Sequence, residues 1–172
     1  CRRAAAVTRN RRVGLIATAA SVRSGAYQRS LRQLDPDIAV TAKACPLFVP
    51  LVENGRFRRG DVVIETVARE YLEPLRREGL DTLILGCTHY PLLTDIIGDI
   101  MGPGVTLINT GEEAAWELKR TLRGLDLLAP EGPAGRATLC ASDQPEQFGV
   151  MASYFLGESL TRPVQPVDID RY

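Results

Sequence analysis

The sequence contains little of what most metal and nucleotide sites require. Its 172 residues include one histidine and four cysteines, and no two cysteines have the C-x-x-C spacing typical of zinc sites. A single histidine cannot complete a usual zinc ligand set, so we expect no metal. No G-x-G-x-x-G motif, Walker loop or G-x-S-x-G elbow is present. Nucleotide-binding and serine-hydrolase functions therefore lack support.

Long apolar runs and an excess of one charge are also missing. No run reaches the roughly 18 apolar residues of a membrane span, and no signal peptide is visible. Lys and Arg number 21, as do Asp and Glu, which argues against a broad nucleic-acid surface. The widely spaced cysteines indicate free thiols in a reduced compartment. We expect a cytoplasmic protein that binds neither membranes nor nucleic acids.

Short apolar runs alternate with helical patterns along the chain. Strands are predicted at 12–18, 38–41, 81–85, 105–108, 136–140 and 164–167. Helices are predicted at 4–7 (the end of one), 25–34, 61–78, from Pro91 to about 101, 110–122, and from Ser142 or Asp143 to 156. Residues 19–24 are expected to form a turn, and 129–135 a Gly/Pro-rich linker. The alternation predicts an α/β fold with a parallel, flavodoxin-like sheet flanked by helices.

The stretch LILGCTHYPLL, residues 83–93, is the part around which the rest is organised. It reads as a buried strand, a tight turn and a helix with Pro91 in its first turn. Cys87, Thr88 and His89 would then lie at the carboxyl end of a strand, where open α/β sheets bind ligands. A helix N-terminus also favours thiolates and carboxylates. A thiol and an imidazole in this position could move protons.

Each of these residues also has a purely structural interpretation. Free cysteines are often small buried hydrophobes, so Cys87 could belong to the core, and a lone histidine is usually structural. Thr88 could cap the helix or bind a ligand carboxylate. The apolar run 45–53 contains two prolines and is expected to be a buried loop or short helical turn ending at Glu53. Glu53 could simply be solvated there, and Cys45 and Cys140 are expected in the core.

Several segments resemble bacterial glutamate racemases, in the same order along the chain. Residues 85–93 resemble the family's second-cysteine motif, and residues 14–27 resemble the strand and turn that open its second domain. Residues 44–53, with the sequence ACPLFVPLVE, resemble an internal loop of the family. Residues 68–72 and 104–108 also fit. The resemblance extends over nearly the whole chain and weakens after about residue 121.

The resemblance implies a cofactor-independent isomerase with two pseudo-symmetric α/β domains. Such an enzyme interconverts L- and D-glutamate by cysteine proton transfer and supplies D-glutamate for peptidoglycan in cell-wall biogenesis and cell shape. Cys87 would be one catalytic base and acid, assisted by His89. Thr88 and His89 would contact the substrate, and Glu53 would lie near His89. Since the α-proton is weakly acidic, the thiolate needs a dry site and contacts to the substrate carboxylate.

The sequence departs from the family at one important point. The family's Asp-Ser and Cys-Asn-Thr motifs, the second of which holds the other cysteine, are not found. We therefore expect a fragment in which residues 1–110 form the α/β domain with the Cys87-Thr88-His89 motif. Residues 111–172 would complete a missing N-terminal domain. A homodimer acting on glutamate is expected. The alternatives are a racemase acting on aspartate or a related acid, and a non-catalytic binding module with a structural Cys87.

Overall fold

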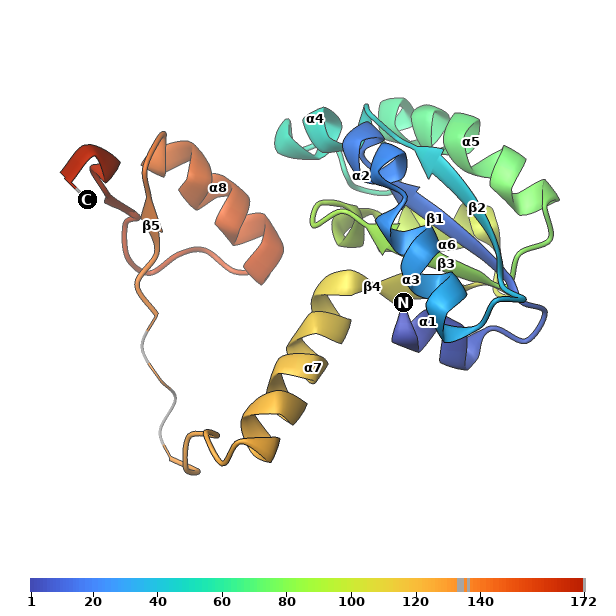
Figure 1. Cartoon of the computed structure of the whole chain (residues 1–172). Helices are drawn as coiled ribbons and strands as arrows, with labels where there is room; N and C mark the ends of the chain where they lie inside the picture. Colours follow the sequence, from blue (N-terminus) through green and yellow to red (C-terminus); the bar gives the residue numbers. More distant parts are fainter. Residues whose placement is uncertain (133–134, 136, 172) are drawn as a thin grey trace. The chain divides into compact units, whose positions relative to one another are not determined.

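The chain forms two compact units, Cys1–Leu128 and Ala129–Tyr172, in the computed structural model shown in Figure 1. The structure describes residues 1–132, 135 and 137–171. Part of the predicted linker, and Arg136 at the start of the predicted strand 136–140, lie outside the described residues. No helix in the described part of the chain is long and apolar enough to cross a membrane.

The first unit is built on a four-stranded parallel sheet, as the sequence predicted. Its strands run in the order β2-β1-β3-β4. They are β1 (Arg12–Ala17), β2 (Ala39–Ala44), β3 (Thr82–Gly86) and β4 (Thr106–Asn109). The helices are α1 (Arg2–Val7), α2 (Ala19–Ser24), α3 (Ala26–Leu34), α4 (Phe48–Glu53), α5 (Val62–Arg77), the 3-10 helix η1 (Tyr90–Leu93), α6 (Thr94–Met101) and α7 (Thr110–Gly124). Parallel pairing brings the carboxyl ends of all four strands to one edge.

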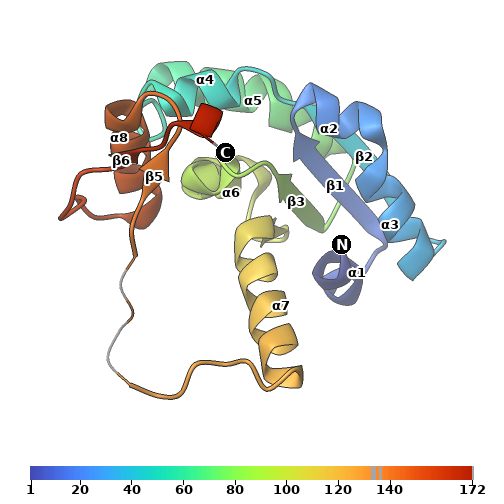
Figure 2. The same cartoon turned by 60° about the vertical axis from the view of Figure 1, so that its left-hand side comes forward.

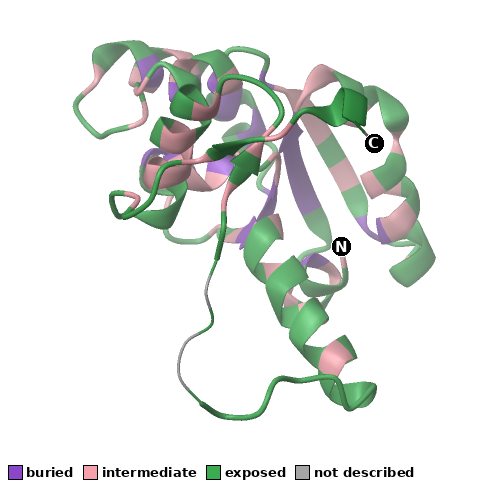
Figure 3. Cartoon of the chain, turned by 90° about the vertical axis from the view of Figure 1, so that its left-hand side faces the viewer, coloured by how far each residue is buried: buried purple, intermediate pink, exposed green. Residues whose placement is uncertain are grey.

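Helices cover both faces of this sheet, which explains why its central strands are continuously apolar. Figures 1 and 2 show α1 and α3 on one side of the sheet and α5 and α6 on the other. Figure 3 shows the buried residues concentrated in the strands between these layers. The core on the α1 and α3 side contains Ala4, Val13, Leu15, Ala17, Leu31, Ile38, Ile84 and Ile108. A strand buried on both faces needs no polar alternation, as is usual in parallel sheets.

Helix boundaries agree with the sequence at α5 and differ at α2 and α7. The Asp61 carboxylate caps α5 by accepting a hydrogen bond from the backbone of Val63, as predicted. The expected turn at residues 19–24 is instead the short helix α2, because the Thr18 hydroxyl caps it and Gly25 ends it at a φ of 63°. The cap of α7 is Asn109 rather than Thr110, which lies within the helix.

In its described residues, the C-terminal unit holds two very short parallel strands and one longer helix. These are β5 (Cys140–Ala141), α8 (Pro145–Leu156) and β6 (Gln165–Pro166), followed by the 3-10 helix η2 (Ile169–Arg171). Neither Ser142 nor Asp143 caps α8. The N-cap is Gln144, whose backbone lies in the left-handed region. The expectation that Cys140 lies in the core is wrong. Its side chain is exposed, and within the described residues its two-residue strand pairs only with β6.

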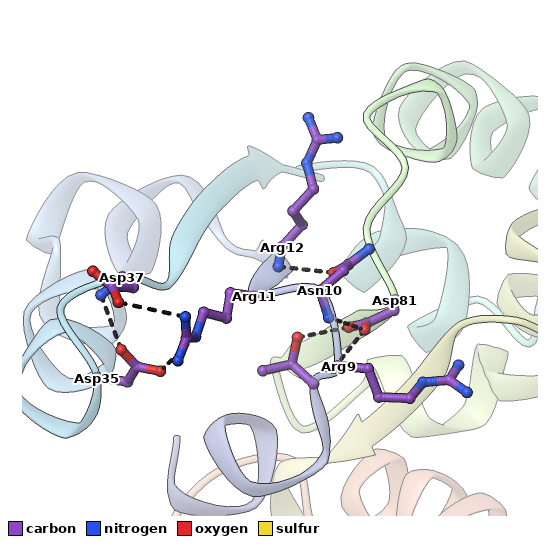
Figure 4. Close-up of polar contacts among 8 residues, drawn as sticks. Arg9, Asn10, Arg11, Arg12, Asp35, Asp37 and Asp81 are labelled. Carbon is purple, nitrogen blue, oxygen red and sulfur yellow. Dashed lines mark hydrogen bonds and ion pairs between the residues drawn. The ribbon is translucent and has the colours of Figure 1, made fainter.

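A buried carboxylate fastens the start of β3 to the turn before β1. The Asp81 carboxylate accepts four hydrogen bonds, from the hydroxyls of Thr8 and Thr82 and from the backbone N–H groups of Arg9 and Asn10. Figure 4 shows Asp81 facing Arg9 and Asn10. Burial alone would raise the pKa of Asp81, but the hydrogen bonds outweigh it and lower the pKa below its ordinary value. The charged form is therefore stabilised in the folded chain.

Replacing Asp81 with asparagine is expected to destabilise the chain by about 2–3 kcal/mol at pH 7, because an amide accepts these hydrogen bonds poorly. Since the folded-state pKa is lowered, the carboxylate stabilises fully above its unfolded value of about 3.9. That contribution falls as the pH drops through the lower folded value. Urea unfolding followed by circular dichroism between pH 3 and 7 measures both effects.

The exposed Asp37, which pairs with Arg11 in Figure 4, provides the control for this experiment. Asp37→Asn should cost less than about 1 kcal/mol, as is usual for surface ion pairs. Equal losses in Asp81→Asn and Asp37→Asn would contradict the role given to Asp81.

Candidate active site

The candidate site begins where β3 ends, at the sheet edge shared by all four strands. Gly86 pairs with Ala17 of β1, and a Cβ at Gly86 would lie 2.8 Å from Leu15 Cδ1 and 3.0 Å from the Ile16 carbonyl oxygen. The chain at this position therefore passes too close to β1 for a side chain. This close approach fixes the point at which the next residue, Cys87, leaves the sheet.

The turn after Gly86 presents Cys87, Thr88 and His89 in succession. Pro91 lies in the first helical turn, as predicted, but this turn is the 3-10 helix η1, and the α-helix begins only at Thr94. Cys87 and His89 are half-buried, and Thr88 is exposed. The three side chains thus stand at the rim of the sheet edge, accessible to a small molecule.

The structure brings His89 into contact with the other three predicted site residues. His89 Nδ1 lies 3.8 Å from Cys87 Sγ and 3.4 Å from Thr88 Oγ1. On the opposite side of the ring, Nε2 lies 3.2 Å from Glu53 Oε1. A thiol, an imidazole and a carboxylate therefore form one chain of polar contacts. Such a chain can transfer a proton from sulfur to the ring while the carboxylate orients the ring.

Glu53 reaches this position because residues 45–53 fold over the turn. The run forms the short helix α4, which ends at Glu53, in agreement with the predicted loop or helical turn. Phe48 and Val52 of α4 are buried, whereas the Glu53 side chain is 45% exposed. The apolar face of α4 thus packs inward and leaves the carboxylate at the end of the helix facing His89.

The neighbouring strand contributes a second helix start at the same edge. Asn109 ends β4, which pairs with β3, and its side chain accepts hydrogen bonds from the backbone of Gly111 and Glu112. The Thr110 hydroxyl donates to the Leu85 carbonyl at 2.9 Å. The local sequence pattern predicted only a capping role for Thr110. Its contact with β3 depends on strand order, which such a pattern does not reveal.

Cys45 shows what the same side chain does in a different environment. It is fully buried, as predicted, and its thiol donates to the Lys43 carbonyl. Burial raises the pKa of Cys45 to about 12, despite the opposing effect of the Lys43 ammonium. A thiol in this state is a poor base and nucleophile at neutral pH. Cys87 is therefore the better placed of the two for proton transfer.

Comparison with known proteins identifies the family. The model of the Asp/Glu/Hydantoin racemase family matches residues 1–118, which include the whole sheet and the candidate site. The chain belongs to this family. The predicted resemblance to glutamate racemases is confirmed at the same time, since the similar proteins carry that name.

Three similar proteins illustrate the relationship. The glutamate racemase of Geobacter metallireducens is 45% identical over 159 residues, which cover 92% of this chain and 58% of that protein. The crystal structure of glutamate racemase isoform RacE1 from Bacillus anthracis matches with a TM-score of 0.87 at 34% identity. That match covers 98% of this chain and 61% of the other.

The third is the crystal structure of the Francisella tularensis glutamate racemase in complex with D-glutamate, with a TM-score of 0.82 at 31% identity. It covers 94% of this chain and 59% of that one. In all three comparisons, this racemase-family chain spans about three fifths of the length of its relative.

Cys87 is expected to react with iodoacetamide at least about tenfold faster than Cys45 at pH 7, because Cys87 is accessible whereas Cys45 is buried and protonated. Cys1→Ser and Cys140→Ser should be introduced first, so that only these two thiols remain. Mass spectrometry of tryptic peptides over time gives the two rates. Comparable rates in the folded chain would contradict the assignment of Cys87 as the reactive thiol.

Proposed function

We propose that this chain carries one catalytic half of a glutamate racemase, a cofactor-independent isomerase that interconverts L- and D-glutamate. The observation that carries the proposal is the contact chain from Cys87 through His89 to Glu53 at the carboxyl edge of the sheet. The names of the similar proteins support glutamate as the substrate. The D-glutamate complex of a relative supports a small amino acid as the ligand.

Cys87 serves as the proton-transfer group for one face of the substrate. The thiol passes its proton to His89 Nδ1, and the Glu53 carboxylate on Nε2 stabilises the resulting imidazolium. The Cys87 thiolate then takes the proton from the substrate Cα, which leaves an electron pair delocalised onto the substrate carboxylate. The Thr88 hydroxyl donates a hydrogen bond to that carboxylate as its charge grows. Reversal of these steps returns a proton to the same face.

Inversion at Cα needs a second group on the opposite face. A proton removed by Cys87 must be replaced from the other side, so one cysteine cannot complete the reaction. Cys45 is buried and unsuited to this role. We assign the second face to a part of the enzyme outside these 172 residues, and the C-terminal unit to a second α/β domain that this part completes. Of the predicted segment 111–172, α7 lies in the first compact unit. The exposed Phe148 and Phe155 of α8 fit a segment that packs against further chain.

The biological setting follows from the same proposal. A glutamate racemase supplies D-glutamate to peptidoglycan synthesis, and the free cysteines of this chain suit a reduced compartment. We therefore propose a cytoplasmic enzyme involved in cell-wall biogenesis. Activity toward aspartate, in place of glutamate, is the alternative within the family.

An upstream-extended protein is expected to racemise glutamate, whereas the 172-residue chain should show less than about 1% of that rate, because it lacks an acid for the second face. Cys87→Ser in the extended protein should lower kcat/KM at least about 100-fold. Solvent deuterium incorporation at Cα, together with optical rotation, measures both exchange and inversion. L- and D-glutamate should be tested separately, with L- and D-aspartate as comparison substrates.

Two results would overturn the proposal. Full racemisation by a verified 172-residue preparation would mean that another group in this chain serves the second face. An inactive extended protein that folds and binds glutamate would indicate a binding module in which Cys87 is structural.

A further inference from the structure

The polar contact between Glu53 and His89 depends on the placement of a very short helix. Helix α4 has six residues and no side-chain hydrogen bond at its N-cap, Leu47. Isolated helices of this length are unstable in water, so packing must supply the order. The contacts made by residues 45–48, before and at the start of α4, and the burial of Val52 therefore fix where Glu53 lies.

Tyr90 makes both a polar and an aromatic contact with this segment. Its side chain is fully buried, and its hydroxyl donates to the Cys45 carbonyl at 3.0 Å. The same carbonyl accepts a longer bond, 3.3 Å, from the backbone N–H of Phe48. The Tyr90 hydroxyl thus completes the turn that leads into α4. Burial raises the pKa of the Tyr90 phenol, and the nearby Cys45 and Cys87 add to the rise, so the group remains a donor at neutral pH.

Aromatic packing reinforces this hydrogen bond. The rings of Tyr90 and Phe48 meet edge to face, with centroids 5.2 Å apart and an interplanar angle of 89°. Phe48 meets Tyr71 of α5 in the same way, at 5.3 Å and 73°. Such pairs favour one relative orientation of the rings. The first residue of α4 is therefore held between η1 and α5.

Tyr90 is also the residue directly after His89. One short segment consequently carries both the imidazole and the side chain that anchors the helix bearing its carboxylate partner. Glu53 lies five residues after Phe48, about 7.5 Å along the helix axis. The whole helix is only about one and a half turns long, so a displacement at its start also displaces Glu53.

We propose that Tyr90 is a positioning residue, whose hydroxyl bond to the Cys45 carbonyl and ring contact with Phe48 set the Glu53–His89 distance. This inference rests on the proposed function for its catalytic consequence, but its geometry can be tested separately. A phenylalanine at position 90 would fill the same space without a polar atom to bury. Packing alone therefore does not require the Tyr90 hydroxyl. Its role is the hydrogen bond that holds the Cys45 carbonyl in place.

The test compares Tyr90→Phe with Glu53→Gln in the 172-residue chain, using the imidazole NMR signals at a fixed pH of about 7. Histidine occurs once in the sequence, so the signals belong to His89 without assignment. Glu53→Gln should shift the Hε1 and Nε2 resonances, since it removes the charge beside Nε2. Tyr90→Phe should shift both resonances in the same direction, by at least half as much.

Thr82→Val is the matched control for loss of a buried hydroxyl. Thr82 is fully buried at the start of β3, and its hydroxyl donates to Asp81 at 2.9 Å, at the end of the strand away from the site. Thr82→Val should destabilise the chain as Tyr90→Phe does, yet move the His89 resonances by less than about a tenth of the Glu53→Gln shift. Phe48→Leu, which keeps the hydroxyl and removes the edge contacts, should move the resonances as Tyr90→Phe does.

Kinetics of the upstream-extended protein provide the second readout. Tyr90→Phe should lower kcat for glutamate about tenfold and change KM less than about twofold, because misplacing a group that assists Cys87 affects the chemical step. Thr82→Val should leave kcat within about twofold of the parent at the same temperature.

The outcomes separate the two proposals. If Glu53→Gln shifts the His89 resonances while Tyr90→Phe and Phe48→Leu leave them unchanged, the positioning role is overturned and the proposed function stands. If all three variants shift the resonances but the extended protein has no racemase activity, the positioning geometry stands and the proposed function fails. A shift in Thr82→Val equal to that in Tyr90→Phe would also overturn the positioning role.

Discussion

The pairing of β3 with strands on both of its sides is the constraint on which the rest of the structure depends. Its register with β1 places Gly86 beside Ala17, and its register with β4 places Leu85 beside Asn109. These two alignments bring the residues after β3 to the same edge as the N-terminus of α7. Helices on both faces exclude water from the strand, so its backbone groups have no good partners other than those of its neighbours. The sheet therefore locates the turn that carries Cys87.

The chemistry at that edge depends on the different burial of two cysteines, Cys45 and Cys87. Cys45 and Cys87 both come directly after parallel strands, yet Cys45 turns inward under α4 and Cys87 remains at the rim. The difference comes from the next residues in each segment. The buried Phe48 and Val52 of α4 pack the first segment inward, whereas Thr88 and His89 keep the second in contact with solvent. Of these two thiols, only that of Cys87 contacts His89 and, through it, Glu53.

The sequence was sufficient for the four strands of the first unit and for the buried end of the motif. Among the described residues of the predicted strand 136–140, however, only Cys140 lies in a strand, β5. Continuous apolar runs at β1 and β3 identify strands covered on both faces, and Asp61 and Gly79 mark the ends of α5. The sequence was insufficient where tertiary contacts determine helix caps and side-chain partners. Thr18 caps the helix α2, although the small, polar residues around it predicted a turn. Asn109, and not Thr110, caps α7, because the Thr110 hydroxyl donates to the Leu85 carbonyl. The sequence around Tyr90 does not indicate that its hydroxyl bonds to the Cys45 carbonyl, 45 residues earlier in the chain. Cys140 was misjudged because its short strand has little around it.

The Asp81 carboxylate joins parts of the chain that are 71 to 73 residues apart in sequence. In polymer terms it is a non-covalent cross-link that closes a long loop containing β1, β2 and all the helices between β1 and β3. Closing such a loop costs conformational entropy that grows only slowly with its length. The same bonds that set the start of β3 thus also close most of the first unit into a ring, with the cross-link at one edge of the sheet and the Cys87 turn at the other. The two are separated by the single strand β3, so the length of this strand sets the distance between them.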